Sequence, residues 1–599
     1  MRSLIQFIIL GLGSGATYAL FAQGAVLIYR GSGLVNFAQG ALGMFAAYFG
    51  FLELKEKHDL PTVVSLTLAV LAAGLVSYVF QMIVLRRLRR AAAIVRVIST
   101  IGLLALIQSI VEKRFGAANR PIEQYLPHRV FNVGGVFIQE ERIYIVAISV
   151  LVTTALWAWT RFTRVGLAIN AAAQNERAVQ TLGWSPDRLA GLTWALGGAL
   201  AGLAAVLVAP LTGLSPSTFT LVVTISGLGA ALLGGFHSFP VTFIGGLIIG
   251  LTESLATRYK GDVQNWLHQS QITGLNRAPA FIAILLVLVV RGRGLPLRSH
   301  IADRLPKLGS GVFNPRGLVL STLIVLALLF GVMDESWAQA TFVSLSVGVM
   351  ILSIVVLTGF AGQLSLGQYA VAGVAALIAG KFVHGGMTPE LAILLSVVMT
   401  IPIGLLFALP ALRTRGVNLA VVTLGLGYTV SEVVFANAHY LGPPIDGGTN
   451  IGLIKLFGIE VDAFRHPHRW AVVCLIAFVL VSLVVANLRR SDTGRRLIAV
   501  RTNERAAASL GISVFTVKLF SFAVAAGIAA IGGILIGFRS QNIQYGGFNV
   551  FESISTVGFA VTGGIGFVLA GVFASPNASG GLATRVIEDW IGLENRWDV

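Results

Sequence analysis

Apolar runs of about 20 residues follow one another along almost the whole chain, and an α-helix needs a run of that length to cross a bilayer. Hydrophobic residues make up 55% of the 599 and charged residues only 12%, whereas roughly a quarter of a soluble domain is charged. A soluble protein could not bury so much apolar surface, so the chain must fold in lipid. The sequence predicts an all-α polytopic membrane protein, with spans near 3–28, 34–52, 62–85, 94–111, 143–160, 188–208, 221–236, 239–256, 278–290, 317–333, 340–358, 363–383, 391–411, 417–437, 470–487, 516–537 and 550–566.

Arginine and lysine gather in some of the loops between these runs, and their distribution sets the orientation. The positive-inside rule makes basic loops cytoplasmic. The formal charge of +17 therefore reflects cytoplasmic loops rather than a nucleic-acid partner. When the crossings are counted, the basic loops all fall on one side, near residues 86–96, 161–188, 291–316, 413–415 and 489–505.

One polar segment between apolar runs is written twice. Gly166 to Gly183 reads GLAINAAAQNERAVQTLG, and Gly494 to Gly511 reads GRRLIAVRTNERAAASLG. We predict that each connector is a short helix along the membrane surface, with the bounding glycines letting the chain turn out of one span and back into the next. The repeated Asn-Glu-Arg triplet offers charge and hydrogen bonds to a soluble partner. The alternative is a solvated loop with a fortuitous repeat.

The two halves resemble each other beyond this connector. GLVNFAQ at 33–39 resembles GQLSLGQ at 362–368, and Thr100-Ile-Gly102 resembles Thr423-Leu-Gly425. The run at 317–333 has no counterpart in the first half, so a second repeat can follow the first without inversion. The sequence predicts two parallel-related halves of about eight helices each, at residues 1–300 and 317–599. A cytoplasmic linker at 301–316 is expected to join them.

Six polar residues occupy matching positions in glycine-rich apolar runs of the two halves. A polar side chain in hydrocarbon must face protein or water, so a translocation pathway between the halves is one place for them. The alternative is that they hydrogen-bond neighbouring helices, where small residues let the backbones approach. The six are Asn36, Gln39, Thr100, Ser365, Gln368 and Thr423.

The ordered series of motifs resembles the two permease subunits of branched-chain amino-acid ABC importers, fused in one polypeptide. The first half carries NFAQG (36–40), STIG (99–102) and LGGFHSFP (233–240), as in the shorter subunit. The second half carries GFAGQLSLGQ (359–368) and TGGIG (562–566), as in the longer subunit. The resemblance implies that the repeated connectors are cytoplasmic coupling helices.

In this family the coupling helices dock on two ABC ATPase subunits, and an extracytoplasmic binding protein delivers the substrate. The resemblance implies a permease of the bacterial inner membrane that imports branched-chain or related small amino acids, or amides, by alternating access. The connector residues that it assigns to ATPase contacts are Gly166, Asn175, Glu176, Arg177, Gly183, Gly494, Arg501, Asn503, Glu504, Arg505 and Gly511.

The sequence itself offers no means of hydrolysing ATP. It has no G-x-x-x-x-G-K-[ST] phosphate loop and no Cys/His metal spacing, so we predict no enzymatic activity, no metal site and no bound cofactor. ATP and Mg²⁺ are expected in partner ATPase subunits. The alternative is a secondary transporter driven by an ion gradient, which predicts paired intramembrane charges and often inverted repeats.

The chain departs from the family pattern in two places. Position 170 is Asn where the family commonly has a basic residue, so the first connector is expected to be weaker or asymmetric. The second half ends without an apolar run equivalent to 278–290, so its last helix is expected to be absent or replaced.

Overall fold

The computed structural model describes residues 2–116, 118–122, 124–127, 129–133, 135–216, 224–266, 274, 306–412, 414, 416–437 and 448–591. Within these ranges ten helices are long and apolar enough to cross a membrane, and the sheets are three small pairs of strands. These features confirm the predicted all-α polytopic fold. The chain divides into two compact units, unit 1 (Met1–His268 with Leu275–Arg304) and unit 2 (Gln269–Gly274 with Leu305–Val599).

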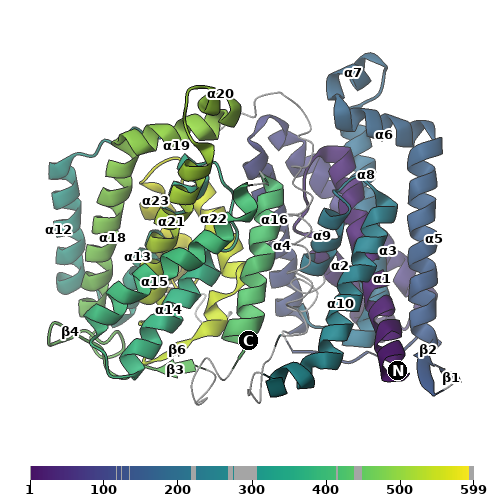
Figure 1. Cartoon of the computed structure of the whole chain (residues 1–599), viewed down its shortest axis with the longest axis horizontal. Helices are drawn as coiled ribbons and strands as arrows, with labels where there is room; N and C mark the ends of the chain where they lie inside the picture. The colour runs from purple at the N-terminus through teal and green to yellow at the C-terminus, as the bar shows by residue number, and fades with distance from the viewer. Residues whose placement is uncertain are drawn as a thin grey trace. The chain divides into compact units, whose positions relative to one another are not determined.

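Unit 1 is a bundle of helices that carries two short helices, α6 (Arg164–Gln174) and α7 (Glu176–Thr181), at one end (Figure 1). The N-terminus and an antiparallel hairpin of β1 (Val130–Val133) and β2 (Val136–Gln139) lie at the opposite end. The other helices and their extensions are α1 (Arg2–Ser32), α2 (Gln39–Tyr48) with the π-helical η1 (Phe49–Lys57), α3 (Thr62–Phe80) with η2 (Gln81–Leu85), α4 (Ala93–Phe115), α5 (Glu140–Phe162), α8 (Pro186–Thr212), α9 (Thr224–Leu233) and α10 (Phe239–Trp266).

Glycines bring the central helices of unit 1 into close contact. Gly11 and Gly15 of α1 face Gly246 and Gly250 of α10, and a Cβ added at Gly250 would lie 2.3 Å from the Gly15 nitrogen. Small residues four positions apart allow such an approach between membrane helices. Helix α8 packs against α1, α2 and α3 on another side of this pair, so the core of unit 1 forms around α1.

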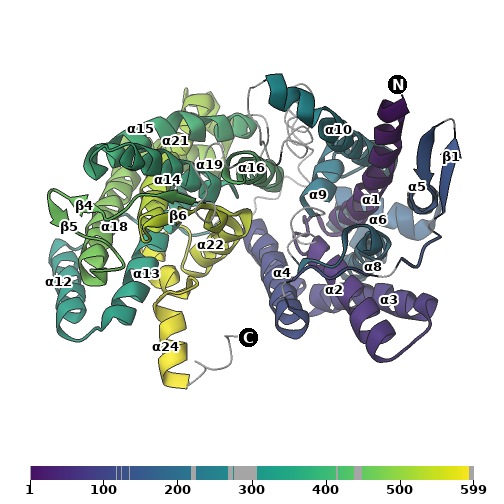
Figure 2. The same cartoon turned by 90° about the horizontal axis from the view of Figure 1, so that it is seen from below.

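Unit 2 begins with α12, which lies along α18 at the rim (Figures 1 and 2). In its centre α21 packs against α13, α14 and α15. The strand pairs β3 (Gly448–Asn450) with β6 (Asn542–Gln544) and β4 (Lys455–Leu456) with β5 (Ile459–Glu460) lie at the end away from α20 (Glu504–Ser509). The helices are α12 (Pro315–Gly331), α13 (Glu335–Ile354) with η5 (Val355–Phe360), α14 (Gln368–His384), α15 (Pro389–Ala408), α16 (Val417–Val430) with η7 (Ser431–Phe435), α18 (Pro467–Arg490), α21 (Val514–Gly537), α22 (Val550–Thr562), α23 (Ala570–Ala574) and α24 (Leu582–Ile591).

Large apolar side chains stay exposed along several of these helices. Leu71 of α3, Leu320 of α12 and Leu394 of α15 are 61%, 60% and 62% exposed. Soluble monomers rarely leave extensive contiguous apolar surface uncovered. These faces therefore suit contact with lipid.

Two predicted spans begin before their helices do. The run at 34–52 starts in a buried turn, at 33–38, that separates α1 from α2. The run at 363–383 likewise starts in a buried turn before α14. Both turns consist largely of apolar and small residues, so hydropathy alone does not distinguish them from helix.

Some predicted spans are shorter than expected in the part of the chain that the structure describes, most of all α9 and α22. Helix α9 has 10 described residues and α22 has 13, and each is followed by a Gly-Gly turn in which Gly235 and Gly564 take φ angles of +66° and +92°. The run at 278–290, and 301–305 of the linker, lie outside the described residues. Where the second half lacks a final apolar run, the structure has the short helices α23 and α24, which pack against α13.

Candidate functional site

Each repeated connector forms two helices that meet at an asparagine. In unit 1 these are α6 (Arg164–Gln174) and α7 (Glu176–Thr181), and in unit 2 they are α19 (Asp492–Thr502) and α20 (Glu504–Ser509). The prediction of a single helix is wrong in this respect. Asn175 and Asn503 are extended, with φ of −151° and −157°, and asparagine is a strong helix N-cap. We call α6–α7 and α19–α20 the two coupling hairpins, after the role that the resemblance implies for them.

The asparagine side chains satisfy amides at the start of the second helix of each hairpin. The Asn503 Oδ1 accepts hydrogen bonds from the backbone nitrogens of Arg505 (3.0 Å) and Ala506 (3.1 Å). The Asn175 Oδ1 accepts one from the nitrogen of Ala178 at 3.1 Å. Both side chains therefore help to fix the bend between the two helices.

The four bounding glycines serve two different purposes. Gly183 and Gly511 have φ of +82° and +78°, so they supply the predicted turn back toward the next span. Gly166 and Gly494 instead lie in the first turn of α6 and α19, and a Cβ there would lie 2.4 Å from the Trp159 oxygen and 2.1 Å from the Leu488 oxygen. These two glycines let the chain turn out of the preceding span by leaving room for close packing on its last turns, rather than by a left-handed φ.

A small apolar core fixes each coupling hairpin to the span that follows it. In unit 1, Ile169 of α6 and Val179 of α7 cluster with Leu189 of α8. In unit 2, Leu497 of α19 and Ala507 of α20 cluster with Val517 of α21. Each coupling hairpin is thus attached to a membrane-spanning helix by packing as well as by the chain.

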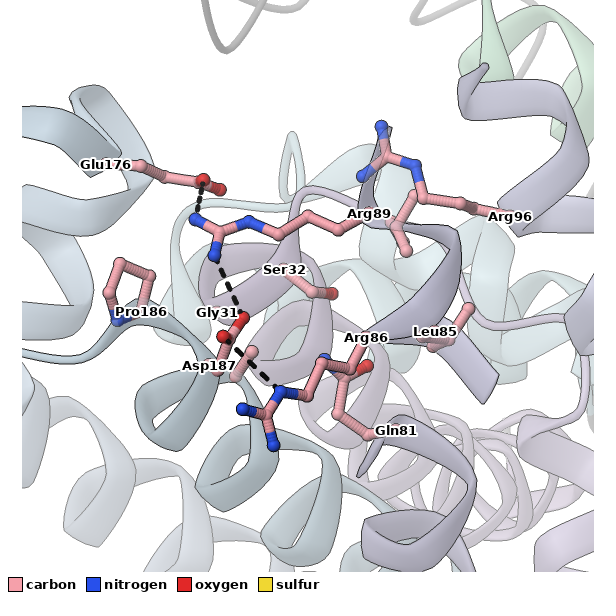
Figure 3. A pocket seen from close by; sticks show the side chains of 12 residues that line it. Gly31, Ser32, Gln81, Leu85, Arg86, Arg89, Arg96, Glu176, Pro186 and Asp187 are labelled. Atoms are coloured by element: carbon pink, nitrogen blue, oxygen red, sulfur yellow. Dashed lines mark hydrogen bonds and ion pairs between the residues drawn. The ribbon is translucent and has the colours of Figure 1, made fainter. Parts of the chain in front are cut away.

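Glu176 is held on the surface of unit 1 by a network of exposed ion pairs (Figure 3). Its Oε2 lies 3.0 Å from Nη2 of Arg89, which belongs to the 3-10 turn η3 (Arg87–Arg90) between α3 and α4. Arg89 also contacts Asp187 of α8 at 3.2 Å, and Arg86 lies 3.7 Å from the same carboxylate. Glu176 and Arg89 are 45% and 39% exposed. The network borders a hollow whose wall also includes Arg96.

Glu504, at the equivalent position of unit 2, is only partly exposed. Its Oε1 lies 3.0 Å from the Nζ of Lys518 on α21, and the two side chains are only 12% and 3% exposed. The Lys518 ammonium also donates a hydrogen bond of 2.9 Å to the carbonyl oxygen of Ala411. Ala411 lies in the 3-10 turn η6 (Pro410–Leu412) between α15 and α16.

The remaining connector residues differ in their surroundings. Arg505 is exposed on α20, whereas Arg501 donates a 2.7 Å hydrogen bond to the Pro306 oxygen, and partial burial lowers the pKa of its guanidinium. Asn170 accepts a hydrogen bond from Arg30 and donates one of 3.0 Å to the Thr160 oxygen. The side chain of Arg177 lies outside the described structure.

The six polar residues predicted to line a pathway are buried, and each hydrogen-bonds within its own unit. The Asn36 amide donates to Gln39 at 3.2 Å, and the Gln39 amide donates to the Gly197 oxygen at 2.9 Å. Thr100 accepts from the Phe37 nitrogen at 3.2 Å, and Thr423 accepts from the Leu366 nitrogen at 3.0 Å. In this conformation they brace the buried turns, together with Ser365 and Gln368.

Lys518, Arg89 and Asp187 were not among the predicted site residues. A lone lysine in the apolar run VFTVKLFSF is a signal in itself, because a charge beside hydrocarbon needs a partner. Arg89 carries no such signal, since it is one of several arginines in the same loop.

Comparison with known proteins gives this repeated arrangement a family. The sequence model for "Branched-chain amino acid transport system / permease component" matches twice, at residues 7–290 and 336–592. The chain belongs to this family. Because each half matches separately, one polypeptide carries two permease units, as predicted.

Individual relatives agree with the family match. The "High-affinity branched-chain amino acid transport system permease protein BraD" of Pseudomonas aeruginosa is 30% identical over 308 residues, which cover 50% of this chain and 97% of the relative. The LivH permease protein of Escherichia coli is 26% identical over 304 residues, 49% of this chain and 94% of its own length. The LivM permease protein of Escherichia coli is 28% identical over 287 residues, 43% of this chain and 66% of its own length. With the ten candidate spans, these relatives confirm a multi-pass protein of the bacterial inner membrane.

Proposed function

We propose that this chain is the transmembrane permease of an ATP-driven importer that moves branched-chain amino acids, or related small amino acids and amides, inward by alternating access. The observation that carries the proposal is the pair of coupling hairpins, each packed on the span that follows it. A force on α7 or α20 reaches α8 or α21 through these small apolar cores. ATP and Mg²⁺ are bound by separate ATPase subunits.

Each coupling hairpin offers one docking surface, so the proposed complex contains two ATPase subunits. Leu182 and Leu510 end the two hairpins at equivalent positions and are 74% and 78% exposed. A protruding apolar side chain surrounded by polar groups suits insertion into a pocket of a protein partner. Exposed polar groups beside them, such as Arg505 and Asn175, would set the orientation of docking. An extracytoplasmic binding protein completes the proposed system.

The six buried polar residues are proposed to border the substrate path when their turns rearrange. A zwitterionic amino acid needs neutral hydrogen-bonding partners inside the membrane, and Asn, Gln, Ser and Thr supply them. Nothing in these side chains selects a branched aliphatic group, so the binding protein is the proposed source of selectivity. Gln39→Leu is expected to lower uptake while the ATPase subunits stay bound.

The proposal is tested by co-purification and transport. The tagged chain is purified with its ATPase subunits, reconstituted in proteoliposomes with the binding protein, and assayed for uptake of labelled leucine. Uptake that requires both ATP and the ATPase, without a second permease chain, supports it. If the chain binds the ATPase subunits but leucine is not taken up, the ATP-driven mechanism is retained and leucine is rejected as the substrate. Uptake driven by an ion gradient alone favours a secondary transporter.

A further inference from the structure

The glutamate of each coupling hairpin is paired with a cation of its own unit. Glu176 meets Arg89, and Glu504 meets Lys518, at 3.0 Å in both cases. The two glutamates are equivalent in the repeat, but the two cations are not. Arg89 comes from the turn η3, ahead of the hairpin in the sequence, and Lys518 comes from α21, after it.

Both pairs nevertheless connect the hairpin to the same part of each unit. Arg89 belongs to η3, between α3 and α4, and the Lys518 ammonium also binds the Ala411 carbonyl in η6, between α15 and α16. The elements after these turns correspond as well, since Thr100 of α4 and Thr423 of α16 brace the buried turns in the same way. In each unit the hairpin glutamate is therefore linked to the equivalent 3-10 turn, although the residues that form the link differ.

We infer that these ion pairs are clasps that make each coupling hairpin and the adjacent 3-10 turn move together, and that Glu176 and Glu504 are positioning residues rather than contacts for the ATPase. The inference rests on the proposed function, because it presupposes an ATPase acting on the hairpins. Glu504 supports it most directly, since a carboxylate turned inward onto a buried lysine presents little surface to a partner (Figure 3 shows the more open clasp of unit 1).

Burial explains how the clasp of unit 2 transmits movement. Lys518 is only 3% exposed, so separating α20 from it would leave a buried ammonium without its carboxylate, which is strongly unfavourable. Relative motion of α20, η6 and α21 is therefore suppressed. Because α21 packs against α13, α14 and α15, a displacement of the hairpin reaches the centre of the unit. The exposed pairs of unit 1 hold their hairpin more weakly.

The deciding measurement is the amount of labelled leucine imported per ATP hydrolysed by the full chain, reconstituted with its ATPase subunits and binding protein. Lys518→Ala is expected to lower this ratio about tenfold or more, because losing one partner of a buried ion pair costs far more than losing an exposed one. Retention of the ATPase should stay within about twofold, since Lys518 is buried away from the docking surface. Lys518→Arg keeps the charge and is expected to restore most of the ratio.

Leu510→Ala is the matched control on the same hairpin. It is expected to weaken retention of the ATPase while the ratio for bound complexes stays near that of the unaltered chain. An unchanged ratio in a folded Lys518→Ala variant, or loss of ATPase retention in it, would overturn the clasp. If Lys518→Ala does not fold, Glu504→Gln decides, because its neutral amide has the same shape, and an unchanged ratio again contradicts the proposal.

Hydrogen exchange of the chain alone separates this inference from the proposed function. Lys518→Ala should speed exchange of the amides in α20 and η6 and leave α7 unchanged. Unaltered exchange counts against the clasp whatever the transport result. Failure of the unaltered chain to import leucine with ATP counts against the proposed function instead.

Discussion

The two coupling hairpins have the same backbone conformation, but different ion pairs attach them to their units. Each bends at an asparagine and ends at a left-handed glycine, Gly183 or Gly511. The glutamate after the bend is half-exposed among arginines in unit 1, whereas in unit 2 it is only 12% exposed and pairs with one buried lysine. A repeated sequence has thus kept the local conformation that it encodes, while the partners supplied by the rest of each unit have diverged.

The largest difference is expected when each glutamate is removed. Glu504→Ala leaves the Lys518 ammonium buried without its carboxylate and should destabilise unit 2 by about 3–5 kcal/mol. Glu176→Ala removes an exposed pair and should cost about 1 kcal/mol or less. Thermal unfolding of the purified chain in detergent measures both. Equal losses would mean that the two hairpins are fastened alike.

The next effect concerns the glycines that start the hairpins. Gly494→Ala places a Cβ 2.1 Å from the Leu488 oxygen, and such overpacking typically costs about 1–3 kcal/mol. Gly166→Ala should act similarly, since its nearest atom is the Trp159 oxygen at 2.4 Å. The same unfolding assay compares them. If either variant is as stable as the unaltered chain, that glycine is not packed closely against the preceding helix.

The exposed surfaces of the two hairpins should contribute equally to ATPase binding, although the ion pairs that attach the hairpins to their units differ. Leu182→Ala and Leu510→Ala are each expected to weaken ATPase binding about tenfold, the size of effect typical of an interface anchor. Titration of purified ATPase subunits onto the chain in nanodiscs gives the affinities. The nearby exposed Arg161 on α5, outside both hairpins, provides a control in Arg161→Ala, which should change neither affinity.

A smaller effect is expected at the asparagines, and it should be alike in the two hairpins. Asn503 accepts hydrogen bonds from the backbone nitrogens of Arg505 and Ala506, and Asn175 accepts one from that of Ala178, so Asn503→Ala and Asn175→Ala should each cost about 0.5–2 kcal/mol. Hydrogen exchange of α20 and α7 reports the local loss. Unchanged exchange in either variant would mean that its asparagine does not stabilise the bend.

The smallest expected effect is that of salt. Screening lengths fall from about 10 Å at 0.1 M to about 3 Å at 1 M ionic strength, which weakens exposed ion pairs much more than buried ones. Raising the KCl concentration over this range should speed exchange of α7 amides and leave α20 nearly unchanged. Glu176→Gln should abolish most of the salt response of α7.

The sequence predicted what apolar length and repetition encode. The helical membrane fold, the two halves and the turns at Gly183 and Gly511 follow from hydropathy, from the repeat and from the conformational freedom of glycine. The bend at Asn175 and Asn503 was also readable, since an asparagine followed by glutamate and small residues is a typical helix start. Treating the connector as a single helix overlooked that signal.

Other features depend on contacts between distant parts of the chain. Nothing in the local sequence tells whether Gly494 provides a turn or space for a neighbour, because that depends on where the Leu488 carbonyl lies. The apolar run around Lys518 indicates that its ammonium needs a partner, but it does not identify Glu504 as that partner. The polar residues of the buried turns, such as Gln39, satisfy the backbone in this conformation, so their part in transport depends on other conformations.

Helix α12 has a consequence for how this protein can evolve. It touches its unit mainly along α18, and Leu329 is the one buried side chain among its residues, which the structure describes throughout. Selection can therefore act on its length and its preference for lipid, but hardly on the identity of individual side chains. Among related fused permeases, the sequence of α12 should diverge faster than that of any other membrane-spanning helix. An unrelated apolar segment of equal length should replace α12 without loss of transport.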